Sequence, residues 1–167
     1  MFAALDNTAI RECNETDIAA IEAIINLAAE AYRNVIPADC WHEPYMSRLE
    51  LVAEIASGVK FWGYQQSIGL VGIMGLQKAG DASLIRHAYV RPEYQHQGIG
   101  RALLRTLAGQ ATGRLLVGTW AAAHWAICFY ERHGFCLVSE EEKDRLLATY
   151  WTIPLRQRQT SVVLVRG

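Results

Sequence analysis

One short segment of the sequence has the residue types and spacing of an anion-binding site. It reads Gln95-His-Gln-Gly-Ile-Gly and follows a β-like run that ends at Val90. A helical pattern begins around Gly98, and the first turn of a helix leaves backbone N–H groups without an intrahelical partner. These donors and the positive end of the helix dipole favour a phosphate group. Two glycines would let a pyrophosphate approach the backbone, and Arg101 and Arg105 add positive charge nearby.

Two common phosphate-binding motifs do not fit this segment. A dinucleotide fingerprint requires Gly-x-Gly-x-x-Gly, and Leu103 stands at the third glycine position. The acid that this fingerprint has about 20 residues further on is replaced by Thr119, Trp120 and Ala121. The Gly-Lys-Ser/Thr of a Walker loop does not occur. Taken alone, the Gly-x-Gly therefore indicates either a phosphate site or close packing of a helix.

A second segment favours the phosphate site. Residues 126–135 read Ala-Ile-Cys-Phe-Tyr130-Glu-Arg-His-Gly134-Phe, about thirty residues after the first segment. The first segment fits the pattern Gln/Arg-x-x-Gly-x-Gly/Ala, and the second resembles an Ala-x-x-Phe-Tyr-x-x-x-Gly-Phe helix. These are the two signatures of the GNAT superfamily of acetyl-CoA-dependent N-acetyltransferases. The order of the expected elements from Thr8 to Val165 is also similar to that family's, so the sequence is identified as a member by resemblance.

The resemblance implies that the chain binds acetyl-CoA as a co-substrate. In the family, backbone amides of the loop hold the pyrophosphate, and the pantetheine arm pairs with the preceding strand like an added strand. The family often has an asparagine three residues before the signature alanine, where this chain has Ala123, so no side-chain contact to the cofactor is expected there. Carried onto this sequence, the cofactor-binding residues are Ala88, Tyr89, Val90, Gln95, His96, Gln97, Gly98, Ile99, Gly100, Arg101 and Tyr130.

The resemblance also assigns a general acid but leaves the base open. Tyr130 matches the family's tyrosine that protonates the departing thiolate, whose conjugate acid has a pKa of about 8.5. The alternative role for Tyr130 is that of a core aromatic residue. Candidate bases are His87, on the strand before the loop, and His124, at the start of the second signature helix, with an ordered water as the default. Strand alternation turns either His87 or Arg86 toward the acceptor.

The need for a base depends on the acceptor amine. A lysine-like amine is neutral in roughly one molecule in 2,500 at pH 7, whereas deprotonating an α-amine costs only about 1 kcal/mol. The acceptor site is expected between the N-terminal helices and in the segment before the last strand. Aromatic and charged residues cluster in this part of the sequence, and His42, Glu43 and Tyr45 are among them. The substrate-binding candidates are Tyr32, Arg33, Trp41 and Arg86.

Charge is unevenly placed along the chain. Residues 1–60 carry ten acids against four bases, whereas residues 86–114 carry five arginines against one acid. The surplus of arginines in residues 86–114 suits an anion such as the cofactor. The surplus of acids in residues 1–60 predicts attraction of a cationic acceptor. Ordinary solvated surface charge is the alternative for both.

The periodicity of the sequence predicts a mixed sheet flanked by helices. Together with the resemblance it predicts an α/β (α+β mixed) fold, one GNAT-like domain over residues 1–167. The sheet is central and mostly antiparallel, has six or seven strands, and is splayed between its two parallel central strands. Strands are expected at residues 8–13, 59–64, 68–76, 82–90, 115–120, 135–138 and 161–165. Helices are expected from Asn14 or Thr16 to Tyr32, and at residues 46–56, 98–111, 124–133 and 140–150.

The composition of the chain bears on whether it spans a membrane, holds disulfides or a metal, or binds nucleic acid. With 51% hydrophobic and 20% charged residues, the 167-residue chain is expected to be one soluble, cytoplasmic domain without a membrane span. Four scattered cysteines and five histidines without i, i+4 spacing indicate neither a disulfide framework nor a metal site. The net charge of −1 disfavours a nucleic-acid partner. The last strand, 161–165, either pairs across a homodimer or is an ordinary member of the sheet.

The expected function is transfer of an acetyl group from acetyl-CoA to a primary amine of a small molecule, peptide or protein. The resemblance implies direct attack of the amine in a ternary complex. Two alternatives stay open: a non-catalytic acyl-CoA-binding sensor on the same fold, and a transferase that uses another acyl-CoA.

Overall fold

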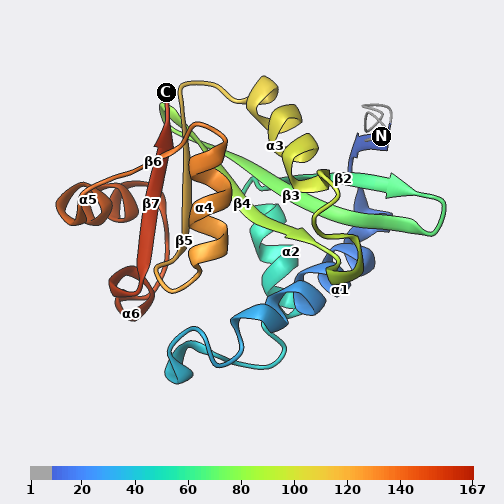
Figure 1. Cartoon of the computed structure of the whole chain (residues 1–167), viewed down its shortest axis with the longest axis horizontal. Helices are drawn as coiled ribbons and strands as arrows, with labels where there is room; N and C mark the ends of the chain where they lie inside the picture. Colours follow the sequence, from blue (N-terminus) through green and yellow to red (C-terminus); the bar gives the residue numbers. More distant parts are fainter. Residues whose placement is uncertain (1–8) are drawn as a thin grey trace.

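The computed structural model describes residues 9–167, which form a seven-stranded sheet flanked by helices (Figure 1). The strands lie in the order β1-β2-β3-β4-β5-β7-β6. Neighbouring strands are antiparallel except for β4 and β5, which are parallel in the middle of the sheet. This is the mixed sheet expected from the sequence. Its strands are β1 (Ile10–Glu12), β2 (Lys60–Gln66), β3 (Gly69–Ala79), β4 (Ala82–Val90), β5 (Arg114–Trp120), β6 (Cys136–Leu137) and β7 (Ser161–Arg166).

Two capping boxes are encoded in the sequence: one begins the 3-10 turn Glu15–Asp17 that leads into the first α-helix, and the other begins the second α-helix. Asn14 accepts a hydrogen bond from the Thr16 amide at 2.9 Å, and Asp17 accepts one from the Asn14 amide at 2.8 Å. Ser47 and Glu50 make the same reciprocal pair at the second helix. No helix in the described part of the chain is long and apolar enough to cross a membrane. The helices are α1 (Ile18–Ala29), α2 (Arg48–Ala56), α3 (Ile99–Gln110), α4 (His124–Arg132), α5 (Glu140–Tyr150) and α6 (Leu155–Gln159).

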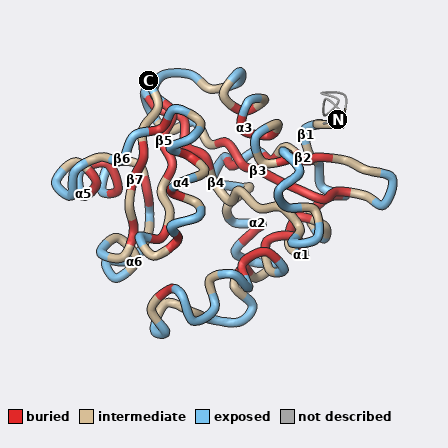
Figure 2. The backbone as a smooth tube through the Cα atoms, in the orientation of Figure 1, coloured by how far each residue is buried: buried red, intermediate tan, exposed pale blue. Residues whose placement is uncertain are grey.

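Helices cover the two faces of the sheet unequally, and buried residues run along the central strands between them (Figure 2). On one face, α3 and α4 pack on alternate residues of the strands such as Ile85 and Val117. On the other face, α1 and α2 cover β2 and β3, while α5 covers Leu84 and Leu116 of the central pair. This second face is therefore covered by two separate groups of helices, with β4 between them.

The structure differs from the sequence-based expectation in small elements. Helix α6 and the 3-10 helices at Glu30–Tyr32, Ala38–Cys40 and Pro92–Tyr94 were not expected. The strand expected at 135–138 is only two residues long, and the start of the first expected strand, Thr8, lies outside the described residues. Strand β7 pairs with β5 on one side and β6 on the other, so it is an ordinary member of the sheet.

Asp17 is expected to stabilise the start of α1 in a pH-dependent way. Two hydrogen bonds of 2.8 Å from Arg11 hold the pKa of Asp17 below its usual value, against the opposing effect of burial. Because the folded-state pKa is lowered, this stabilisation is complete above the unfolded pKa of about 3.9 and is lost as pH falls through the folded value. Asp17→Asn should lower the free energy of unfolding by about 1–2 kcal/mol at pH 7.

Urea unfolding at pH 7 and at pH 3 would measure this effect. Glu15→Gln is the matched control, because it removes an equal charge in the same exposed turn without breaking an ion pair. A loss of stability for Asp17→Asn that is the same at both pH values, or no larger than that for Glu15→Gln, would contradict the assignment.

Candidate active site

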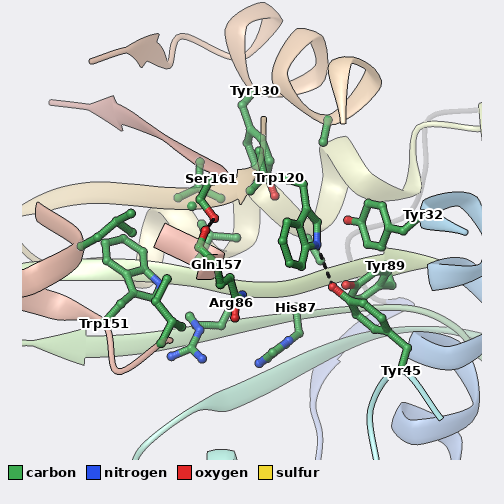
Figure 3. A pocket seen from close by; sticks show the side chains of 18 residues that line it. Tyr32, Tyr45, Arg86, His87, Tyr89, Trp120, Tyr130, Trp151, Gln157 and Ser161 are labelled. Atoms are coloured by element: carbon green, nitrogen blue, oxygen red, sulfur yellow. Dashed lines mark hydrogen bonds between the residues drawn. The ribbon is translucent and has the colours of Figure 1, made fainter. Parts of the chain in front are cut away.

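A wedge opens in the middle of the sheet where β4 and β5 separate. The parallel pairing runs from Ala82 opposite Arg114 to Ile85 opposite Val117. Beyond that point no pairing joins the two strands, so the main chain of 86–90 presents an open edge toward β5. A cavity of about 150 Å³ lies in this wedge (Figure 3). The splay expected from the resemblance is thus present, and it separates the two strands at the carboxyl end of β4.

A β-bulge in β4 decides which side chains face the acceptor side of the wedge. Gly75 of β3 lies opposite Arg86 and Ile73 lies opposite Tyr89, so the intervening β4 segment has one residue more than the β3 segment. The extra residue is accommodated at His87, whose φ of 54° lies in the left-handed region that a non-glycine side chain rarely adopts. A Cβ at position 75 would lie 2.7 Å from the Arg86 carbonyl oxygen, so this close approach requires glycine.

The bulge turns both Arg86 and His87 toward α2, whereas strict alternation allowed only one of them. The carboxylate of Glu54 lies 2.6 Å from Arg86 Nη2 and 3.2 Å from His87 Nε2. Burial alone would raise the pKa of Glu54, but the His87 hydrogen bond and the Arg86 charge outweigh it and lower this pKa. Glu54 is therefore an ionised carboxylate that positions two cavity-lining side chains. The sequence analysis missed it because α2 precedes β4 by some thirty residues.

Tyr130 enters the wedge from the opposite face of the sheet. It lies on α4, is 5% exposed, and packs edge-on against Phe129 and Phe135 at ring distances of 5.1 and 5.3 Å. Burial, and secondarily the neighbouring Tyr32, raises the pKa of Tyr130 well above its usual value. Its hydroxyl has no hydrogen-bond partner within residues 9–167 and lines the cavity. Tyr130 is thus a neutral phenol with a free O–H in the wedge.

Three further tyrosines line the cavity on the side of α1. The Tyr32 ring centroid lies 5.5 Å from that of Tyr45 and 6.3 Å from that of Tyr89. Trp120 Nε1 donates to the Tyr45 hydroxyl at 2.9 Å. Burial raises the pKa of Tyr32 to about 12 and that of Tyr89 well above its usual value. All three hydroxyls are therefore neutral at physiological pH. Tyr45 and Trp120 both line the cavity, and their hydrogen bond connects two segments that are 75 residues apart in the sequence.

The loop before α3 has the open backbone that the sequence predicts. His96 and Gly98 have φ values of 60° and 83°, and Gly98 precedes the helix without a side-chain cap, leaving the first-turn amides free. The Gln95 side chain donates to the Val90 carbonyl at 3.1 Å, so it ties the loop to the end of β4. A Cβ at Gly100 would make only ordinary contact with Phe129 at 3.5 Å. The residues present therefore fit a pyrophosphate at this loop.

Comparison with known proteins agrees with this geometry. Residues 57–136 match the family model described as "Acetyltransferase (GNAT) domain". These residues form a GNAT acetyltransferase domain. No curated protein matches the sequence.

Solved GNAT structures share the fold at low sequence identity. A GNAT-family acetyltransferase from Staphylococcus aureus Mu50 is 20% identical with a TM-score of 0.69, covering 94% of this chain and 96% of the other. PaiA N-acetyltransferase from Thermoplasma acidophilum, solved with coenzyme A, is 19% identical with a TM-score of 0.68, at 95% and 97% coverage. The ribosomal-protein-S18-alanine N-acetyltransferase of Escherichia coli is 20% identical with a TM-score of 0.64, at 94% and 91% coverage.

Some of the site residues expected from the sequence line the cavity in the wedge between β4 and β5, and others do not. Tyr130, His87, Arg86 and Tyr32 line the cavity, as do Ala88 and Tyr89. His124 is exposed at the first position of α4 and does not line it. Arg33 lies over the Trp41 ring at 4.8 Å and is paired with Glu30 and Glu43, and neither Arg33 nor Trp41 lines the cavity.

The acidic surplus of the first sixty residues does not reach the cavity. Six of its ten acids are paired with arginines, and no Asp or Glu lies among the residues that line the wedge. The attraction of a cationic acceptor expected from the charge count is therefore not supported at the cavity itself. The ion pairs join Arg11 to Asp17, Arg48 to Glu22, Arg33 to Glu30 and Glu43, Arg86 to Glu54, and Arg156 to Asp39.

Proposed function

We propose that this GNAT enzyme transfers an acetyl group from acetyl-CoA to a primary amine of a small molecule, peptide or protein terminus. The observation that carries the proposal is Tyr130, a buried neutral phenol with a free O–H in the gap between two parallel strands. Amides of 97–101 at the start of α3 would hold the pyrophosphate, and the open edge of β4 at Ala88 and Val90 would hold the pantetheine arm.

In this proposal Tyr130 donates its proton to the departing thiolate while the amine attacks directly in a ternary complex. The raised pKa of Tyr130 keeps the proton on the phenol until a thiolate forms beside it. His87, held by Glu54, or a water between the tyrosine hydroxyls takes the proton from the amine. His124 is exposed and does not line the cavity, so it is not preferred as the base.

We further propose that the enzyme works in a reducing, cytoplasmic setting as a single N-acetyltransferase domain. All four cysteines are free, and two of them, Cys128 and Cys136, are exposed. Exposed thiols that are not joined in disulfides are typical of reducing compartments.

Release of free thiol from acetyl-CoA in the presence of an amine panel tests the function. We expect thiol release that depends on both substrates, with acetylated amine as the second product. A non-catalytic acyl-CoA sensor would bind coenzyme A in a calorimetric titration but release no thiol with any amine. A transferase for a different acyl group would turn over longer-chain CoA thioesters faster than acetyl-CoA.

A further inference from the structure

The charge of the cavity lining narrows the class of acceptor. Eighteen residues line the cavity, and they include no Asp, Glu or Lys. Arg86 is the one lining residue with a permanent charge, and Glu54, which does not line the cavity, pairs with it from behind. A polyamine, an aminoglycoside or a lysine side chain carries positive charge that no carboxylate of this lining can pair, and burying an ammonium without a carboxylate is costly. The lining instead favours an acceptor that carries an anionic group besides its amine.

Arg86 has donors left for such a group. Its Nη1 donates to Gln77 at 2.7 Å and its Nη2 to Glu54 at 2.6 Å. A guanidinium has five N–H donors in a planar fork, so three donors of Arg86 make no hydrogen bond within residues 9–167. With Gln77 and Glu54 fixing the side chain, which is 15% exposed, Arg86 is held in place before any ligand arrives.

Gln157 supplies a second polar side chain, and this one makes no hydrogen bond of its own within residues 9–167. It lies on α6, is half-buried, and lines the cavity, and its side-chain amide makes no hydrogen bond within residues 9–167. Figure 3 shows Arg86, Gln157 and Trp151 on one side of the cavity, and Tyr32, Tyr45 and Tyr89 on the other. The polar pair is flanked by the apolar side chains of α5 and the following segment, namely Leu147, Trp151 and Ile153.

From this arrangement we infer that the acceptor is an α-amino acid with an apolar side chain, whose free carboxylate is bound by Arg86 and Gln157. This inference rests on the proposed acetyl transfer and names its substrate class. The apolar side chain packs against Leu147, Trp151 and Ile153. The α-amine then lies within the wedge that Tyr130 lines.

Leucine, leucinamide and spermidine, compared by thiol release, test the inference. We expect kcat/KM for leucine to exceed that for leucinamide by about 10- to 100-fold, the contribution of a hydrogen-bonded charge pair. Because amidation lowers the pKa of an α-amine, a preference for the free acid cannot arise from amine basicity. No thiol release with any amine would overturn the proposed function. Turnover of leucinamide or spermidine equal to or above that of leucine would overturn the inference alone.

Gln157→Glu provides a second test, whose readout is the ratio of kcat/KM for two acceptors, so a general loss of activity does not affect it. The new carboxylate should repel the acceptor's carboxylate, so the leucine-to-leucinamide ratio of kcat/KM should fall about tenfold. Gln159→Glu is the matched control, since it adds the same charge to an exposed position of the same helix outside this cavity. The charge-neutral double variant Arg86→Gln/Glu54→Gln should lower the ratio as well. An unchanged ratio in Gln157→Glu and in the double variant would overturn the carboxylate site.

Discussion

Tyr130→Phe is expected to lower kcat by about 10²- to 10⁴-fold, the usual contribution of a general acid. The substitution removes one hydroxyl and keeps the ring in its contacts with Phe129 and Phe135. The hydroxyl has no partner within residues 9–167, so its removal leaves no buried group unsatisfied and should not destabilise the fold. Coenzyme A affinity should stay close to that of the wild type, because the amides proposed to bind the pyrophosphate lie on another helix. Steady-state thiol release and calorimetric titration would measure the two quantities separately.

Tyr150→Phe is the matched control for this change. Tyr150 lies at the end of α5 outside the cavity, where its hydroxyl donates to Asp81. Its loss should leave kcat unchanged. Because burial raises the pKa of Tyr130 well above 10, the wild-type rate should also show no decline from Tyr130 ionisation between pH 7 and 9. Wild-type turnover by Tyr130→Phe would mean that solvent, rather than this phenol, protonates the thiolate.

Local signals in the sequence predicted most of the fold. Asn14 and Ser47 are polar residues followed three positions later by an acid, and both begin helices as capping boxes. The stripe of Ile99, Leu103 and Leu107 became the buried face of α3. Helix α6 was missed because Leu155-Arg-Gln-Arg-Gln contains a single apolar residue and therefore has no hydrophobic period.

The bulge in β4 could not be predicted from alternation alone. The run 82–90 has the composition of an uninterrupted strand, so a regular period of two placed Arg86 and His87 on opposite faces. One extra residue shifts this register and brings both side chains to Glu54. The only cue lies on the neighbouring strand, where Gly75 leaves room for the Arg86 carbonyl. A glycine inside a strand is compatible with a bulge, but it does not identify the partner residue.

The two halves of the site differ in how far they follow from the sequence. The loop at 95–101 is built by consecutive residues, so its helix start and glycines could be identified directly. The acceptor side is assembled from segments that meet only in the fold. Tyr45 contacts Trp120, and Gln157 of α6 and Arg86 of β4 line the same cavity. Such contacts depend on the pairing of distant strands, which no local spacing records.

Gly100→Ala is expected to weaken coenzyme A binding by about 10- to 100-fold while making the protein more stable. Within the protein the added Cβ would make only ordinary contact with Phe129 at 3.5 Å, and alanine in a helix is favoured over glycine by roughly 0.5–1 kcal/mol. The same methyl group would stand between the first-turn amides and a pyrophosphate, costing about one charge-assisted hydrogen bond. Calorimetric titration with coenzyme A and thermal unfolding would measure both effects.

Gly109→Ala separates the two effects, because Gly109 lies near the other end of α3 and a Cβ there meets nothing within 4 Å. It should raise the melting temperature as Gly100→Ala does and leave coenzyme A affinity unchanged. We expect Gly100→Ala to raise stability and weaken coenzyme A binding, and Gly109→Ala to raise stability alone. This combination arises only if the ligand approaches the backbone at Gly100. Equal affinity in both variants would instead assign Gly100 to helix packing against Phe129 and would place the pyrophosphate elsewhere.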